Sequence, residues 1–373
     1  MEDFAIKNIV AGNYFTEPLY LDDGFILTVP ETPVGQHLLK MLDKWEFASV
    51  RTGGTQQDFY TSDDKAKRKV AVSLVNDGTK LAAAEAFFNG LVSYAMNVFT
   101  KAALNGKLPY HEIAEKVREV VEELKVNRRY LLQVQQEAKS PTAGYLGSHA
   151  VRSTILSIVV GMQIKLPSHR LIELGVAAFV HEIGMIKLPT NVYESKGELS
   201  ARDKEMLSFH PAFGYELLKE NNFPVGISIV AMEHHERENG TGYPRRLFGQ
   251  QINLYSKIVA VVCSFEAITA NRPYKKARNG FDGILDLLKN QGQIYDDAVI
   301  KALVQAVSVY PIGTFVLLST NQKAQVIDTN QLSPRYPIVQ IVDVTGADGK
   351  NPVVETSPGS LYIVRSLTRN ELA

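Results

Sequence analysis

The chain has 373 residues, of which 45% are hydrophobic and 21% are charged, the composition of a folded globular protein with two or three domains. Lysine and arginine together number 40, as do aspartate and glutamate, so no global charge attracts a nucleic acid polymer or an anionic membrane. No apolar stretch reaches the roughly 18 residues that span a bilayer, the N-terminus lacks a signal-peptide pattern, and Cys263 is the single cysteine. We therefore expect a cytoplasmic protein without membrane insertion or an internal disulfide.

The first part of the chain, residues 1–54, mixes short β-type segments with turns and predicts a small α+β regulatory module. Residues 25–29 and 47–50 have strand patterns, and residues 35–44 have the periodicity of a short amphipathic helix. Residues 55–79 are polar and charged enough to form a linker or a surface loop.

Helical periodicity begins after this linker. Residues 80–105 and 110–138 each carry apolar side chains at helical spacing, and we interpret residues 80–139 as connecting helices. The second helix could be a signalling or dimerising stalk, or a bundle helix packed on its own domain. The sequence leaves both interpretations open.

Residues 140–310 are predicted to be almost wholly helical, and residues 311–373 are predicted to be a β-rich extension. Helix starts are indicated at Pro167-Ser168, at Ser200 and at Pro224, and residues 254–270 form a strongly apolar helix. Short β-type segments follow at 314–319, 324–328, 338–342 and 361–364. The fold class is therefore mainly α, a helical bundle with a small N-terminal α+β module and a C-terminal β appendage.

Chemically active side chains gather in the helical region. Five of the eight histidines lie on or beside predicted helices, namely His149, His181, His210, His234 and His235. Glu182 follows His181, and the doublet His234-His235 leads into the glycine-rich turn Gly242-Tyr243-Pro244. Imidazole nitrogens and carboxylate oxygens gathered from several helices suit Fe, Mn or Zn better than Ca or Mg. A helical scaffold whose histidines are ordinary core residues is the alternative.

Several of these segments together resemble the HD-GYP branch of the HD-domain metal-dependent phosphohydrolases. Residues 177–189 resemble the family's helix that carries the His-Asp pair, and His210-Pro211 followed by Gly214 resembles its next ligand. Residues 234–244 are close to the family signature, residues 270–275 resemble its downstream basic motif, and residues 310–314 resemble the start of its C-terminal extension.

The resemblance implies a bacterial signalling enzyme that hydrolyses the 3′,5′-phosphodiester of cyclic di-GMP at a cluster of two or three metals, usually iron or manganese. In this family a metal-bridging hydroxide attacks the phosphorus and the ribose 3′-oxygen leaves. The resemblance assigns His149, His181, Glu182 and Cys263 to one metal and His210, His234 and His235 to the second, with Glu182 bridging both. It places Tyr243, Arg272 and Lys275 at the substrate.

This chain departs from the family pattern at four positions. Glu182 replaces the aspartate of the His-Asp pair, and Cys263 replaces a metal-ligating aspartate on a later helix. A thiolate is a softer ligand that favours Zn or Fe over Mn, although a buried, non-ligating cysteine is the alternative. Met185 replaces a catalytic lysine. Lys187 is the candidate substitute, although helical geometry turns it elsewhere. Tyr145 replaces the carboxylate ligand of a third metal, and this replacement favours a two-metal site.

Two functions remain open on this basis. One is an active cyclic di-GMP phosphodiesterase, in which His181, Glu182 and Lys187 are catalytic and two divalent metals are cofactors. The other is a degenerate member that binds cyclic di-GMP, or a partner such as a diguanylate cyclase, without hydrolysis. The retention of all five histidines favours the enzyme. A homodimer formed through residues 110–138 is a further hypothesis.

Overall fold

The protein divides into two compact units, residues 1–76 and 77–373. The computed structural model describes residues 2–11, 13–21, 26–28, 34–45, 47–57, 78–137, 145–193, 200–270, 278–330, 333–342, 344, 351–358, 361–368 and 371–372. Residues 271–277, which include Arg272 and Lys275 of the basic motif at 270–275, and most of the expected linker lie outside these residues.

The first unit is a small α+β module, as the sequence predicts. Strands β1 (Glu2–Ala5), β3 (Leu19–Tyr20), β4 (Ile26–Thr28) and β5 (Ser49–Thr52) form an antiparallel sheet in the order β1-β5-β3-β4. A second pair joins β2 (Tyr14–Phe15) to β6 (Gln56–Gln57), and one 3-10 turn, η1 (Ile6–Asn8), and one helix, α1 (Gln36–Lys44), complete the described elements. Phe15, Leu19, Leu42 and Val50 are among the residues that form its core.

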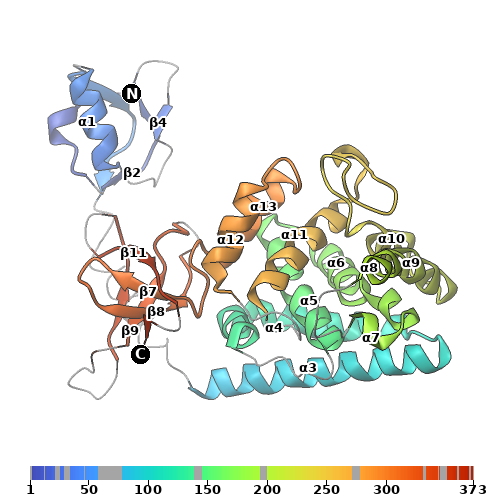
Figure 1. Ribbon diagram of the computed structural model, residues 1–373. Coiled ribbons are helices and arrows are strands. Elements are labelled where there is room, and N and C mark those ends of the chain that lie inside the picture. Colours follow the sequence, from blue (N-terminus) through green and yellow to red (C-terminus); the bar gives the residue numbers. More distant parts are fainter. Residues whose placement is uncertain are drawn as a thin grey trace. The chain divides into compact units, whose positions relative to one another are not determined.

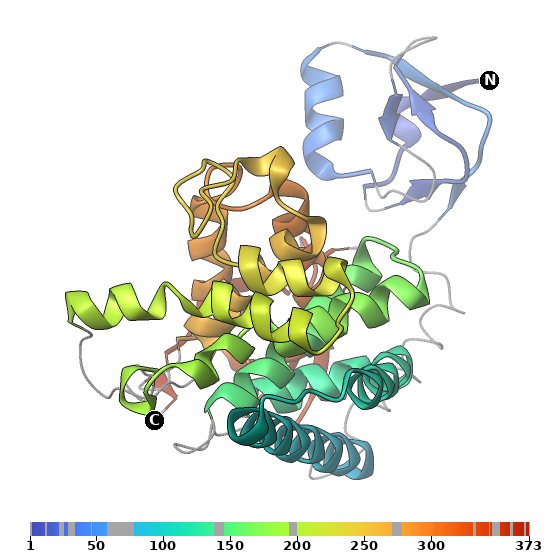
Figure 2. The same ribbon diagram turned by 90° about the vertical axis from the view of Figure 1, so that its right-hand side faces the viewer.

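The second unit begins with two long helices, α3 (Gly78–Asn105) and α4 (Tyr110–Glu137). Val117, Val120, Val121 and Leu124 of α4 are buried in the same core as helices α5 and α6, and α3 also packs against α5 (Figures 1 and 2). The structure therefore supports the bundle interpretation of residues 110–138. Asn127 has a non-helical backbone and kinks α4.

The rest of the bundle is built from shorter helices, and several predicted starts are confirmed. Helix α6 begins directly after Pro167, α10 begins after Pro224, and the Ser200 side chain caps α8 by accepting from the Asp203 amide at 3.2 Å. The helices are α5 (Tyr145–Gln163), α6 (Ser168–Val180), α7 (Thr190–Tyr193), α8 (Ala201–Leu207), α9 (His210–Glu220), α10 (Val225–Glu233), α11 (Leu254–Thr269), α12 (Gly280–Lys289) and α13 (Asp297–Val307), with 3-10 turns η2 (Ile183–Lys187) and η3 (Gly249–Gln251).

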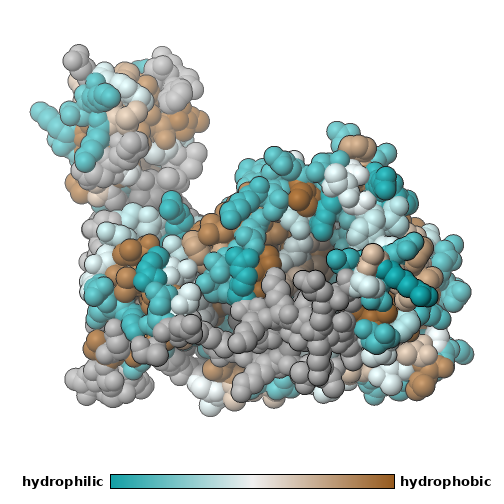
Figure 3. Space-filling model, in the orientation of Figure 1, coloured by the Kyte–Doolittle hydropathy of each residue, from teal (hydrophilic) through white to brown (hydrophobic). Residues whose placement is uncertain are grey.

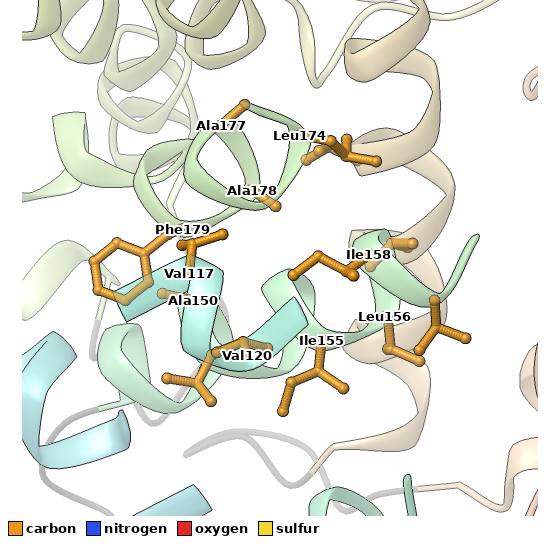
Figure 4. Packing of buried hydrophobic residues seen from close by; sticks show 14 of the residues in the cluster. Val117, Val120, Ala150, Ile155, Leu156, Ile158, Leu174, Ala177, Ala178 and Phe179 are labelled. Carbon is orange, nitrogen blue, oxygen red and sulfur yellow. The ribbon is translucent and has the colours of Figure 1, made fainter. Parts of the chain in front are cut away.

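Helix α5 is the centre of the bundle because apart from His149 and Arg152 its buried side chains are apolar or small. Residues 146–161 are all buried, which is the pattern of a helix surrounded by other helices. Ile155 and Ile158 pack with Val117 and Val120 of α4 and with Leu174 of α6 (Figure 4). Burying an aliphatic side chain of this size contributes about 1.5–3 kcal/mol. This packing gives His149, on the same helix, a rigid backbone.

The C-terminal extension is an antiparallel sheet of strands β7 (Phe315–Leu318), β8 (Lys323–Asp328), β9 (Ile338–Ile341), β10 (Val353–Glu355) and β11 (Ile363–Ser366). The strand order is β10-β9-β8-β7-β11, so the predicted β appendage is confirmed, with β10 as an addition. Alternate residues of β7, β8 and β9 are buried, as expected for strands with one covered face. An ion pair from Arg129 of α4 to Asp328 of β8, at 3.2 Å, connects the sheet to the bundle.

The surface of the bundle is mixed in character. Figure 3 shows hydrophilic side chains over much of the visible face, interrupted by small hydrophobic areas. Within the described part of the chain, no helix is both long enough and apolar enough to cross a membrane.

Candidate metal centre

The histidines predicted from the sequence come together at the ends of helices around α5. His149 is on α5 itself, His181 and Glu182 follow the last residue of α6, and His210 is the first residue of α9. His234 and His235 directly follow α10, and Cys263 is on α11. Helix α6 ends at Val180, so residues 183–187 form the separate turn η2 instead of continuing the helix as the family resemblance suggested.

Two glycines allow the His181-Glu182 segment to lie beside His210. A Cβ atom on Gly184 would lie 2.5 Å from the Gly214 amide nitrogen and would also overlap the His210 carbonyl oxygen, both of which are backbone atoms. A Cβ atom on Gly214 would in turn lie 3.3 Å from the Gly184 nitrogen. The close contact between η2 and α9 therefore requires glycine and brings Glu182 next to the first residue of α9.

Three of the histidines have their tautomer fixed by the backbone. Nδ1 lies 2.7 Å from the Ala178 carbonyl oxygen in His181, 2.6 Å from the Leu207 oxygen in His210 and 2.9 Å from the Ala231 oxygen in His234. A carbonyl oxygen can only accept, so each Nδ1 must carry the hydrogen. In the neutral ring Nε2 then presents a lone pair, which is the form that binds a metal.

His149 is oriented in the same way by a carboxylate. Its Nδ1 atom donates to Glu266 Oε2 at 2.7 Å, and both side chains are buried. Hydrogen bonds of this kind commonly hold metal-binding histidines in place. The notable consequence is that Nε2 of His149 faces Nε2 of His181 at 3.2 Å, and Nε2 of His210 faces Nε2 of His234 at 3.2 Å.

These separations indicate shared cations. Two lone pairs at this distance repel each other unless a proton or a metal lies between the rings. Two nitrogen ligands of one tetrahedral ion, each at about 2.0–2.1 Å, are separated by about 3.3 Å. The observed spacing of both histidine pairs is therefore the spacing that a common metal ion would impose.

Glu182 directs one carboxylate oxygen toward each pair. Its Oε2 atom lies 3.1 Å from His210 Nε2, and its Oε1 atom lies 3.8 Å from His149 Nε2 and 3.9 Å from His181 Nε2. The buried Oε2 atom has no hydrogen-bond partner among the described residues, because His210 carries its hydrogen on the opposite nitrogen. Burial alone would raise the pKa of Glu182, but the surrounding imidazoles, His210 foremost, lower it well below its usual value. The carboxylate is thus ionised and in a bridging position.

Two groups of ligand atoms result, each with all its atoms within 4.8 Å of one another. The first half-site consists of His149, His181 and Cys263, and the second half-site consists of Glu182, His210, His234 and His235. The structure therefore contains two adjacent His/Glu/Cys clusters consistent with a binuclear metal site.

The two half-sites differ in their electrostatics. In the first half-site, Cys263 Sγ lies 3.1 Å from His181 Nε2. Burial raises the pKa of the Cys263 thiol, but His181 and His149 outweigh burial and lower this pKa to about 6. Burial lowers the pKa of His149, but Glu266 and Cys263 raise it to about 10. In the second, burial and neighbouring histidines lower the pKa of His235 to about 3 and that of His234 far below its usual value. A thiolate–imidazolium pair therefore occupies the first half-site when it holds no metal.

The glycine-rich loop after α10 places Tyr243 over the second half-site. The Tyr243 ring stacks on His235 at a centroid distance of 4.6 Å and an angle of 15°. The loop folds so tightly that a Cβ atom on Gly242 would lie 2.5 Å from the Arg237 amide nitrogen, so this position requires glycine. Tyr243 thus lies against His235, a candidate metal ligand. The sequence analysis expected Tyr243 to lie at the substrate.

Buried carboxylates that carried no role in the sequence reasoning organise this region. Glu236 accepts from the amides of Arg245 and Leu247 at 2.7 and 3.0 Å, and the equally buried Glu233 pairs with the Arg245 guanidinium. Glu233 also accepts from the Asn253 amide at 3.0 Å. In the sequence, the signal for this role was the position of Glu233 and Glu236, which directly flank the His234-His235 doublet.

The other predicted residues are not part of the clusters. Lys187 is exposed on η2, and no hydrogen bond or ion pair within the described residues joins it to the half-sites. Met185 packs against the hydrophobic core. The Tyr145 ring stacks on His149 at 5.5 Å and 19°, so an aromatic ring covers His149 where the family has a carboxylate.

Comparison with known proteins agrees with this geometry. The HD domain family matches residues 131–299. The chain contains an HD domain. Three curated relatives of this HD-domain protein are cyclic di-GMP phosphodiesterases: PdeB of Borreliella burgdorferi (26% identical, covering 62% of each chain), PA4108 of Pseudomonas aeruginosa (30% identical, covering 60% of this chain and 57% of that protein) and the response regulator RpfG of Xanthomonas campestris (34% identical, covering 39% of each chain).

A solved structure shares the fold. Bd1817, an HD-GYP-type protein from Bdellovibrio bacteriovorus, matches with a TM-score of 0.50 and 14% identity over 81% of this chain and 97% of that chain. The resemblance to the HD-GYP branch is confirmed, and so is the fold class. The aligned regions span less than two thirds of the curated relatives' own length.

Proposed function

We propose that this HD-domain protein is a metal-dependent phosphodiesterase that hydrolyses the 3′,5′-phosphodiester of cyclic di-GMP. The observation that carries the proposal is the position of Glu182, which directs one oxygen toward each of two groups of inward-facing nitrogens. A shared carboxylate between two such groups is the arrangement of binuclear hydrolases. Membership of the HD phosphohydrolases makes hydrolysis of a cyclic dinucleotide the natural reaction.

The proposed ligand sets follow the two half-sites. His149, His181 and Cys263 together with Glu182 would hold one divalent metal, and His210, His234 and His235 together with Glu182 would hold the other. When bound, two such ions lower the pKa of a shared water and offset the charge that develops on the phosphoryl group. The second set, of nitrogen and oxygen, suits Fe or Mn, whereas the thiolate in the first favours Fe or Zn.

The protein's own groups prepare the site for this reaction. Glu266 and the carbonyl oxygens of Ala178, Leu207 and Ala231 keep the Nε2 atoms of four histidines pointing inward. Tyr243 forms one wall of the substrate face. Arg272 and Lys275, outside the described residues, are proposed to bind phosphate or guanine.

The identity of the nucleotide is the finer part of the proposal. PdeB, PA4108 and RpfG are cyclic di-GMP phosphodiesterases, and a further relative, from Vibrio cholerae, is a 3′3′-cGAMP-specific phosphodiesterase with 27% identity over 47% of this chain. Cyclic di-GMP is therefore the first substrate to test. Residues 1–54 are proposed as the regulatory module, residues 140–310 as the catalytic domain, and a diguanylate cyclase as a signalling partner.

Metal analysis combined with turnover tests the proposal. Protein purified without chelators should contain two metal ions per chain and convert cyclic di-GMP to linear dinucleotide or GMP, both separable by chromatography. Cyclic 3′3′-GMP-AMP and cyclic di-AMP, assayed in parallel, give the specificity. Two bound metals and tight cyclic di-GMP binding without any product would overturn the proposed enzymatic activity and would support a degenerate protein that only binds the nucleotide. Met185, which packs against the core where the family has a catalytic lysine, favours this second function.

A further inference from the structure

Helices α5 and α11 each supply one candidate ligand of the first half-site, and each contacts the ligand of the other. His149 on α5 donates through Nδ1 to Glu266 on α11 at 2.7 Å. In the opposite direction, the Oγ atom of Ser153 on α5 lies 3.8 Å from the Sγ atom of Cys263 on α11. Ser153 follows His149 by four residues, about one helical turn, so both side chains lie on the face of α5 toward α11.

The hydroxyl of Ser153 is directed at the sulfur and not at its own helix. The Ser153 side chain is fully buried, where a hydroxyl without a hydrogen bond is unfavourable. Inside a helix such a hydroxyl often donates to the carbonyl oxygen four residues earlier, as Thr154 does to Ala150 at 2.8 Å. Among the described residues, the one hydrogen-bond partner of Ser153 Oγ is instead Cys263 Sγ. The contact is therefore the one that satisfies this buried hydroxyl.

Neighbouring contacts fix the position of Ser153 relative to Cys263. Arg152, the residue before Ser153, forms an ion pair from Nη1 to Glu266 Oε1 at 3.8 Å, and both side chains are buried. Glu266 follows Cys263 by three residues and also holds His149. Because these contacts join the same turns of α5 and α11, they set the register of the two helices and keep the hydroxyl beside the sulfur.

The direction of this hydrogen bond follows from metal binding. A cysteine that ligates a metal is a thiolate, which has lone pairs and no hydrogen, so Cys263 can only accept and Ser153 must donate. A thiolate transfers more electron density to a metal than a carboxylate does. Hydrogen bonds to a ligating sulfur withdraw part of this density and thereby tune the metal.

We propose that Ser153 is a positioning residue of the metal centre, whose hydroxyl donates to the Cys263 thiolate and tunes the metal bound there. The hydrogen bond holds the sulfur in place and offsets part of the extra electron donation that cysteine brings where the family has aspartate. Ser153 and Cys263 therefore act as a pair. This inference rests on the metal centre of the proposed function and is independent of which nucleotide is the substrate.

The test compares S153A with S157A, which removes the same hydroxyl one turn further along α5. Ser157 is equally buried, and its Oγ atom has no hydrogen-bond partner among the described residues. In protein loaded with Co²⁺, the thiolate-to-cobalt absorption band of S153A should move to longer wavelength, because a thiolate without the hydrogen bond gives up an electron more easily. The band should stay at the wild-type position in S157A and in S153T, which keeps the hydroxyl. In chelator competition, S153A should lower metal affinity of the first half-site by about 10-fold and S157A by less than about twofold.

The outcomes separate this role from simple packing and from the proposed function. A cobalt band at the wild-type position in S153A, or an S153A protein that is less stable than S157A without metal but binds metal equally well, overturns the role of Ser153. A wild-type protein without the band removes Cys263 as a ligand and overturns the inference as well. A wild-type protein that shows the band, with the shift in S153A, but neither binds nor hydrolyses a cyclic dinucleotide overturns the proposed function and supports this inference.

Discussion

Glu182 Oε2 and His210 Nε2 lie 3.1 Å apart with no hydrogen available to join them, because His210 donates through Nδ1 to the Leu207 carbonyl. Two acceptors this close require a cation, and the other oxygen of Glu182 faces His149 and His181 in the same manner. One carboxylate therefore directs an oxygen toward each half-site. The longer glutamate side chain, in place of the family's aspartate, still reaches both.

Substitution of Glu182 should affect both metals together. E182Q keeps the shape but removes the charge, and we expect bound metal to fall from two ions per chain to fewer than one, with activity reduced by at least about 100-fold. E182D restores the family's residue but withdraws the carboxylate by one methylene, so a smaller loss is expected. Mass spectrometric metal analysis and turnover measure both effects. E216Q, an exposed residue of α9, is the control. An E182Q protein with full metal content would contradict the bridging role.

Replacing Cys263 should change metal preference in the first half-site. A wild-type protein loaded with Co²⁺ should show a thiolate-to-cobalt absorption band in the near ultraviolet, and C263D should lack this band while still binding two ions. In competition, C263D should take up more Mn²⁺ relative to Zn²⁺ than wild type does, because carboxylate oxygen is the harder ligand. C263A should retain metal mainly in the second half-site. An identical cobalt spectrum in wild type and C263A would show that Cys263 is only a packing residue.

Proton release on metal binding should distinguish the half-sites. In the metal-free protein the pKa of His149 is about 10, so at pH 7.5 it holds a proton that a metal must displace, whereas the low pKa values of His234 and His235 leave the second half-site unprotonated. Affinity of the first half-site should therefore rise with pH between about 7 and 9, and that of the second should stay nearly constant. Calorimetric titration in buffers of different ionisation enthalpy counts the protons. Equal release in wild type and C263A would contradict this assignment.

The sequence identified residues that the structure brings together in the two half-sites, because most of them lie in short local motifs. The pairs His181-Glu182 and His234-His235, and the turn Gly242-Tyr243-Pro244, are contiguous, so their proximity needed no knowledge of the fold. The supporting roles of Glu233 and Glu236 were not identified, because their hydrogen-bond partners are brought to them only by the folding of the loop after α10.

The end of α6 was also beyond local prediction. Residues 177–189 have no helix-breaking residue before Gly184, yet the helix ends at Val180. The cause is tertiary, since η2 must approach the backbone of α9 closely through Gly184 and Gly214. A propensity-based interpretation contains no term for that contact.

The same contact gives the last prediction. In G184A the added methyl group overlaps the His210 carbonyl oxygen and the Gly214 amide nitrogen, which are backbone atoms and cannot move aside cheaply. We expect the free energy of unfolding to fall by about 3 kcal/mol, the upper part of the usual range for overpacking, and metal affinity to fall as Glu182 moves away from His210. G226A is the matched control, because a Cβ atom there contacts nothing within 4 Å and alanine favours the helix. Thermal unfolding of both metal-free variants, followed by metal titration, measures the two effects. A G184A protein as stable as G226A would show that the approach of η2 to α9 is looser than the structure indicates.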